Sequence, residues 1–262
     1  MTQNKTAWIR EPEKYAAYVD RTTEKEILKQ LLAGAYFQGE LPIQPGDVGK
    51  KVLDLGAGLG SLTGFLAALF NRHDVYAVER SREFVSYAEE KTPNPGNITF
   101  YCRHFEDFSP IRFDFILCSH AMQYIDSSVD EFLLKLRDGL TADGEAWIII
   151  QENAGINQIV KTALPFLNIK NPYFERWFVH DHVRRRLSEL GIKFQTSTFI
   201  SAFKTINFEN PDEQDRKCLD FFLLDCYEEK NDALQTHLAQ LGQAIIKNGY
   251  ILHEVGVTRI RR

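Results

Sequence analysis

The ten residues Lys51–Gly60 constrain this chain more than any other stretch, because their sequence is KVLDLGAGLG. A mostly apolar run leads through Asp54 into three glycines at alternate positions, and a second apolar run extends from Leu62 to Phe70. This pattern predicts a buried strand that turns through a glycine loop into a helix. Glycine allows a tight turn and a close approach of the backbone to a ligand, and the start of the helix presents free N–H groups. The stretch therefore predicts a binding loop for a nucleoside-type cofactor.

Strand-like and helix-like segments alternate from this loop onward. We expect strands near 51–56, 74–79, 98–102, 113–119 and 145–151, helices near 61–70, 81–91 and 127–140, and a polar loop at 104–111. Alternating β and α units of this size specify a doubly wound parallel sheet, in which ligands bind at the carboxyl ends of the strands. The expected fold class is therefore α/β, with a mostly parallel, Rossmann-like sheet of seven strands.

The flanking regions complete this architecture. Residues 13–33 predict two helices, the second starting near Thr22 or Thr23, and a glycine- and proline-containing linker from Gly34 follows. After residue 151 we expect an irregular, aromatic-rich segment at 153–180, helices at 181–190, 211–228 and 231–247, and strands at 193–204 and 250–260. The chain then divides into an N-terminal helical lid and linker (1–50), a cofactor-binding core (51–152), and substrate-binding helices with the last two strands (153–262).

Composition and charge exclude several classes of protein. The net charge of −5 argues against a nucleic-acid groove, because such binding depends on many Lys and Arg contacts with phosphates. The N-terminus does not resemble a secretory signal, and the apolar runs are too short to span a bilayer. We therefore expect a cytoplasmic protein that binds neither nucleic acid nor membrane, and that is a monomer or a weak homodimer.

No metal site is expected. The four cysteines form no CxxC pair, which argues against both a zinc site and a disulfide framework. His180, Asp181 and His182 form a cluster at the start of a predicted helix, where helix capping is the more typical role.

The spacing of the glycines separates two kinds of cofactor. A dinucleotide fingerprint, G-x-G-x-x-G, would need a glycine at position 61, which is Ser61. Instead, Gly60 completes G-x-G-x-G after Asp54, which resembles the first motif of class I S-adenosylmethionine-dependent methyltransferases. A nicotinamide-dependent reductase on the same sheet is the alternative, and the position of Gly60 speaks against it.

Later strand ends resemble the same methyltransferase family. Glu79 ends the second strand as the ribose-binding acid does, residues 105–108 resemble the adenine-contacting loop, and residues 113–120 resemble the fourth motif. The resemblance implies S-adenosylmethionine as the cofactor. The cofactor-binding residues it implies are Asp54, Gly56, Ala57, Gly58, Glu79, Arg80, Phe84, Phe105, Glu106, Asp107 and Ser119.

The flanks are similar to the histamine N-methyltransferase family. The similarity lies at Lys14-Tyr15, 22–24, 79–81, 113–125, 187–194 and 219–226. It implies an N-methyltransferase whose small amine or imidazole acceptor binds beneath the helical lid. By position, Glu24 would pair with a cationic substrate, and Tyr15, Tyr124 and Phe221 would form an aromatic wall. The Asn/Asp-Pro-Pro-Tyr signature of enzymes that methylate nucleic-acid bases is absent from the sequence.

His120 departs from the histamine N-methyltransferase pattern, which has glutamine there and an asparagine near the position of Glu254. Because a histidine at a strand end can accept a proton near neutral pH, His120 is the candidate general base, with Glu24 as the second catalytic candidate. Purely structural roles stay open as alternatives: that Glu24 is an exposed acid, and that Phe221 and His120 pack in the core. The expected reaction is in-line methyl transfer to nitrogen; oxygen or carbon methylation of a secondary metabolite and a non-catalytic binding module are alternatives.

Overall fold

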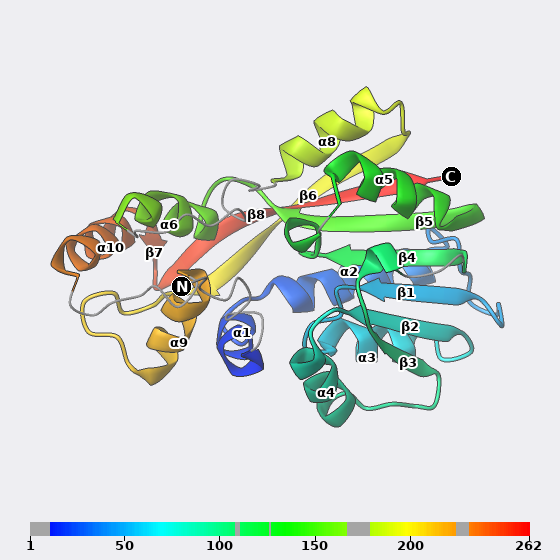
Figure 1. The fold of residues 1–262 in the computed structure, drawn as a ribbon, viewed down its shortest axis with the longest axis horizontal. Helices are drawn as coiled ribbons and strands as arrows, with labels where there is room; N and C mark the ends of the chain where they lie inside the picture. The colour runs from blue at the N-terminus through cyan, green and yellow to red at the C-terminus, as the bar shows by residue number, and fades with distance from the viewer. Residues whose placement is uncertain (1–10, 108–110, 126, 167–178, 224–230) are drawn as a thin grey trace.

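One mixed sheet runs through the protein in the computed structural model, which describes residues 11–107, 111–125, 127–166, 179–223 and 231–262 (Figure 1). The strands are β1 (Lys51–Leu55), β2 (Asp74–Glu79), β3 (Ile98–Cys102), β4 (Phe113–Ser119), β5 (Leu140–Gln151), β6 (Phe194–Lys204), β7 (Ile246–Lys247) and β8 (Tyr250–Arg261). Their order is β3-β2-β1-β4-β5-β8-β6, and β7 pairs with β8. Strands β1 to β5 pair in parallel, whereas β8 is antiparallel to both β5 and β6. The expected α/β, mostly parallel sheet is confirmed, and the short β7 adds an eighth strand.

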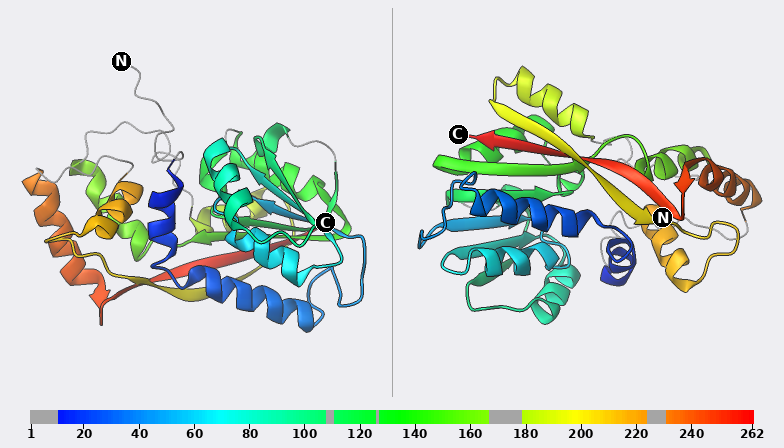
Figure 2. Two further views of the ribbon diagram at one scale, coloured as in Figure 1. Left: turned by 90° about the horizontal axis from the view of Figure 1, so that it is seen from below. Right: turned by 180° about the vertical axis from the view of Figure 1, so that it is seen from behind.

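Helices cover both faces of this sheet. They are α1 (Pro12–Val19), α2 (Glu24–Phe37), α3 (Ser61–Leu69), α4 (Arg82–Lys91), α5 (Val129–Asp138), α6 (Ile156–Ala163), α8 (His180–Glu189), α9 (Glu213–Phe222) and α10 (Asp232–Ile245), with the short turns η2 (Phe105–Asp107), η3 (Met122–Tyr124) and η4 (Leu164–Phe166). Side chains alternate across a strand, so Val52 packs with α2 and α3 on one face, and Leu53 with α5 and α8 on the other (Figures 1 and 2).

A third core lies at the far end of β6 and β8, where α1, α6, α9 and α10 gather (Figure 1). The junction between α1 and α2 is bound there: Thr23 N–H donates to Ala202 O (3.0 Å), and Lys204 N–H donates to Arg21 O (2.8 Å). Arg21 also pairs with Asp215 of α9 at 2.6 Å. These contacts place the first turn of α2 beside the carboxyl ends of β4 and β5.

Several sequence expectations about helices need correction. Helix α2 continues through Gly34 to Phe37 rather than ending at a linker there. Helix α6 occupies part of the segment expected to be irregular, because Ile156, Ile159, Val160 and Ala163 form an apolar helical face. Helix α10 stops at Ile245 and the chain continues as β7. Residues 108–110 of the expected loop, 167–178, and 224–228 of the expected helix lie outside the described residues, and the three-part division of the chain stays a prediction.

The expected capping role of the 180–182 cluster is also wrong. Val179 is the N-cap of α8, and its side chain makes no capping hydrogen bond. The buried ring of His180 instead donates from Nδ1 to Glu152 (3.0 Å) and accepts at Nε2 from the Thr258 hydroxyl (2.9 Å). This ring lies on Gly256, so it fastens α8 to β8.

Gly256→Ala is expected to destabilise the fold. A Cβ at this position would lie 2.0 Å from His180 Cγ, and overpacking of this kind costs roughly 1–3 kcal/mol. Gly34→Ala is the matched control: nothing lies within 4 Å of its added Cβ, and in mid-helix it is expected to stabilise by about 1 kcal/mol. Urea unfolding of both variants measures the difference, and equal midpoints would contradict the packing argument.

Candidate active site

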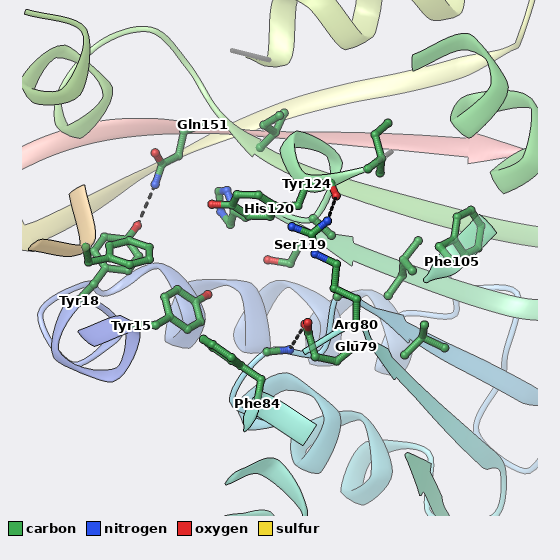
Figure 3. A pocket seen from close by; sticks show the side chains of 18 of the residues that line it. Tyr15, Tyr18, Glu79, Arg80, Phe84, Phe105, Ser119, His120, Tyr124 and Gln151 are labelled. Carbon is green, nitrogen blue, oxygen red and sulfur yellow. Dashed lines mark hydrogen bonds between the residues drawn. The ribbon is translucent and has the colours of Figure 1, made fainter. Parts of the chain in front are cut away.

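A cavity of about 210 Å³ opens where β1, β2, β4 and β5 end, beneath α1 (Figure 3). The structure brings most of the predicted site residues to its wall: Tyr15, Glu24, Gly56, Gly58, Glu79, Arg80, Phe84, Phe105, Glu106, Ser119, His120, Tyr124 and Phe221. Asp54 and Ala57 line a smaller hollow of about 20 Å³ that shares Gly56 and Ser119 with the cavity. Asp107 is a correction: it is exposed and lies outside the cavity wall, because the η2 turn directs Phe105 and Glu106 inward.

The glycine loop has the conformation that its sequence requires. Gly56, Gly58 and Gly60 have φ angles of 75°, 54° and 79°, a region that side chains with a Cβ rarely adopt. A Cβ on Gly56 would also lie 2.4 Å from Ala121 Cβ. Gly60 is the N-cap of α3, so the loop delivers the backbone to the floor of the cavity and then starts the helix.

Glu79 is held so that its carboxylate faces the cavity (Figure 3). Its Oε1 accepts the Ser81 N–H at 2.9 Å, and its Oε2 accepts the Gly58 N–H at 3.2 Å. Each oxygen keeps lone-pair capacity after these bonds, which suits a pair of ribose hydroxyls.

Asp54 supports the loop from beneath rather than facing the larger cavity. Its carboxylate accepts the Thr63 hydroxyl at 2.6 Å and is 2% exposed. Burial raises the pKa of Asp54 to about 6, and the Thr63 hydroxyl and the Lys25 charge oppose that rise. The carboxylate therefore connects β1 to α3, and its contribution to the stability of the fold depends on pH.

The opposite end of the cavity is formed by η2 and the turn after β4. The Phe105 ring packs on Phe132 with centroids 5.3 Å apart, and Glu106 accepts both the N–H and the hydroxyl of Ser127 at 3.2 and 3.0 Å. Arg80 crosses the cavity wall to donate to the Tyr124 carbonyl at 2.8 Å (Figure 3). The space between the Phe105 ring and the Glu106 carboxylate would suit the flat ring of an adenine base.

An aromatic wall closes the other side. Phe221 lies 5.3 Å from Tyr15 and 5.1 Å from Tyr18 between ring centroids, and Phe84 lies 5.9 Å from Tyr15. Phe221 therefore both packs and lines the cavity, which combines the two roles considered from the sequence. Burial raises the pKa of the Tyr15 hydroxyl well above its usual value, and the charge of Glu24 adds to the rise, so this hydroxyl stays neutral at physiological pH.

Glu24 and His120 meet at the centre of the site. His120 Nε2 lies 2.5 Å from Glu24 Oε1, although 96 positions separate the two residues. Glu24 is 1% exposed, so it is not the exposed acid that the sequence left open. Burial acts to raise the pKa of Glu24, but the charge and hydrogen bond of His120 outweigh it and hold that pKa well below its usual range.

The backbone of His120 is an outlier. Its φ of 55° is uncommon for a residue with a side chain, and its N–H donates to Ile149 O at 2.9 Å. Strained residues of this kind cluster at functional sites, where the surrounding structure holds them in place. The His120 ring lies in the cavity wall with Nε2 toward Glu24, and its side chain is 16% exposed.

Sequence reasoning missed several residues of the cavity wall: Tyr18, Lys25, Ile156, Asn157, Val160 and Phe222. Tyr18 was detectable, because it follows Tyr15 by three positions on the same helical face. Gln151, at the end of β5, donates to the Tyr18 hydroxyl at 2.9 Å and lies 3.4 Å from Glu24 Oε2.

In the described part of the chain, no three His, Cys, Asp or Glu side chains are grouped so that they could hold a metal ion, and no helix has the length and apolarity needed to cross a membrane.

Comparisons with known proteins show what this chain is similar to. Residues 52–144 match the family model described as a methyltransferase domain. Malonyl-(acyl-carrier protein) O-methyltransferase of Bacillus cereus is 29% identical over 98 residues, which are 36% of this chain and 35% of that protein. The matched segment thus spans about a third of the curated relative.

Solved structures extend the likeness beyond this domain. The plantazolicin methyltransferase BpumL in complex with SAH has a TM-score of 0.57 at 14% identity, covering 98% of this chain and 94% of that one. YcgJ of Bacillus subtilis has a TM-score of 0.59 at 16% identity, covering 89% and 97%. These likenesses establish the fold. The comparisons do not show the resemblance to histamine N-methyltransferase, which stays a prediction.

Asp54→Asn is expected to change the pH dependence of stability. The carboxyl pKa rises from 3.8 to about 6 on folding, so between these values the folded state binds more protons and loses stability as pH rises. The Asn variant lacks this titration. Its stability relative to the wild type should increase by about 2 kcal/mol from pH 4 to pH 7. Urea unfolding across this range measures the difference, and a flat difference would contradict the assignment.

Proposed function

We propose that this protein transfers a methyl group from S-adenosylmethionine to a nitrogen of a small aromatic amine or imidazole. The observation that carries the proposal is the buried His120–Glu24 pair, which lies beside an aromatic wall in the same cavity as the glycine loop. A small-molecule acceptor, a cytoplasmic location and a monomer or weak homodimer belong to the same proposal.

The cofactor half of the cavity supports this assignment. Glu79 would take the ribose hydroxyls, Phe105 and Glu106 would hold the adenine, and Gly56 and Gly58 would lie against the methionyl part. When bound, S-adenosylmethionine supplies an electrophilic methyl group for in-line displacement by the acceptor. The contribution of the protein is alignment, which is worth roughly 7–11 kcal/mol of barrier in well-oriented reactions.

His120 is the proposed base. A carboxylate accepts hydrogen bonds only, so the ring donates its Nε2–H to Glu24. When the ring is neutral, which is the form that can act as a base, Nδ1 keeps a lone pair. That lone pair would take the proton of the acceptor nitrogen. The charge of Glu24 would stabilise the imidazolium that forms, which makes Glu24 a positioning residue rather than a direct partner of a cationic substrate.

The acceptor half suits a flat ring. Tyr15, Tyr18 and Phe221 supply aromatic faces, and Ile156 and Val160 of α6 add aliphatic contacts. Aromatic faces also attract a cationic methylated product or the sulfonium of the cofactor. The wall would exclude water from the reacting groups.

An oxygen acceptor is the second candidate, and the same His120–Glu24 pair favours it. A phenol is protonated near neutral pH, so a positioned histidine would remove its proton as readily as that of an imidazole. A curated relative named as an O-methyltransferase adds weight to this alternative.

Tritium transfer from methyl-labelled S-adenosylmethionine to a panel of acceptors tests the proposal. We expect labelled product with aromatic amines or imidazoles. Label in a phenol or enol, with none in any nitrogen compound, would replace the proposal by the oxygen alternative. Nicotinamide-cofactor binding without S-adenosylmethionine binding would overturn both.

Replacing His120 by Ala is expected to lower kcat by roughly 10²–10⁴-fold, because the base is lost, with little change in affinity for SAH. Glu24→Gln should also lower kcat. The double variant should be no slower than His120→Ala alone, since the two residues act as one unit. His182→Ala, on α8, is the histidine control. Unchanged turnover of His120→Ala between pH 6 and 9, or additive effects in the double variant, would contradict the proposed base.

A further inference from the structure

Lys25 is a partly buried cation whose role the proposed base does not explain. It lies in the first turn of α2, and it contributes to the wall of both the main cavity and the small hollow beside the glycine loop. Its Nζ donates to the Ser119 hydroxyl at 3.1 Å. Among the residues that the structure describes, Lys25 forms no ion pair with a carboxylate, whereas Lys29, one turn later, pairs with Glu26 at 2.6 Å.

The nearest acids are already engaged elsewhere. Glu24 Oε1 lies 2.5 Å from His120, and Asp54 accepts the Thr63 hydroxyl at 2.6 Å. Burial lowers the pKa of Lys25, and the negative charges of Glu24 and Asp54 oppose that change without contacting the ammonium group. Removing an ammonium even partly from water with a single neutral hydroxyl partner is costly, and an incoming anion would reduce that cost.

We propose that Lys25 binds the carboxylate of the methionyl part of S-adenosylmethionine. This inference rests on the proposed function. The hollow that Lys25 lines also contains Gly56, Ala57 and Ser119, which places the ammonium at the amino-acid end of the cofactor site rather than at its ribose end. An ammonium–carboxylate hydrogen bond in a buried site is among the stronger polar contacts.

Adjacent positions of a helix point about 100° apart, so one turn of α2 serves both halves of the site. Glu24 faces His120, and Lys25 faces the glycine loop. A cofactor carboxylate on Lys25 would therefore hold in place the turn that carries the partner of the base. Binding of the cofactor and positioning of His120 would be coupled through two neighbouring residues.

Calorimetry with two ligands tests this assignment. SAH carries the methionyl carboxylate, and 5′-methylthioadenosine lacks the amino-acid group. For Lys25→Met we expect the Kd of SAH to rise by about 10- to 100-fold and that of 5′-methylthioadenosine to change by less than about twofold. Lys25→Arg should retain most of the affinity for SAH, and Lys29→Met should match the wild type.

The outcomes separate this inference from the function on which it rests. Equal weakening of both ligands, or unchanged SAH binding, would overturn the role of Lys25 while leaving the methyltransferase proposal intact. Wild-type protein that binds neither ligand would overturn the proposed function and this inference with it. If Lys25→Met does not fold, as judged by thermal unfolding, Lys25→Gln takes its place, with the same expected split between the two ligands.

Discussion

The burial of the Glu24 carboxylate is the constraint on which the rest of the site depends. An ionised carboxylate removed from water costs several kcal/mol unless it is paired and hydrogen-bonded. Glu24 is 1% exposed, and its neighbours come from three strands. They are His120 after β4, Gln151 at the end of β5, and His253 of β8. The distance from His253 Nε2 to Glu24 Oε2 is 3.5 Å. The first turn of α2 must therefore lie where these strand ends converge, and the cavity forms around it.

The two halves of the proposed site come from different parts of the chain. The cofactor half uses the loop after β1, the end of β2 and the η2 turn, all within residues 52–144 that match the methyltransferase domain. The acceptor half uses α1, α6 and α9, which come from both ends of the chain and pack as a separate core on β6 and β8. The proposed cofactor site thus uses segments close together in the chain, and the proposed acceptor site uses helices from both of its ends.

What the sequence predicted well has a local physical cause. The positive φ angles of Gly56, Gly58 and Gly60 follow from residue type, and alternating strands and helices lead to a parallel sheet by general rules of chain connection. What it predicted poorly depends on details of short segments. Asp107 is exposed and lies outside the cavity wall, which its position in a strand-end motif did not indicate. Helix α6 was not predicted because eight residues give a weak periodic signal.

By itself the sequence determined the fold class, the glycine loop and the acid at the end of β2, because each depends on residues close together in the chain. Only the tertiary structure decided which side chains Glu24 and Lys25 contact. Glu24 contacts His120 across 96 positions, and Lys25 reaches Ser119 across 94. Neither contact has a periodic or spacing signal, since both arise from the packing of α2 against the ends of β4 and β5. The chemistry of the acceptor therefore resides in contacts that no local pattern encodes.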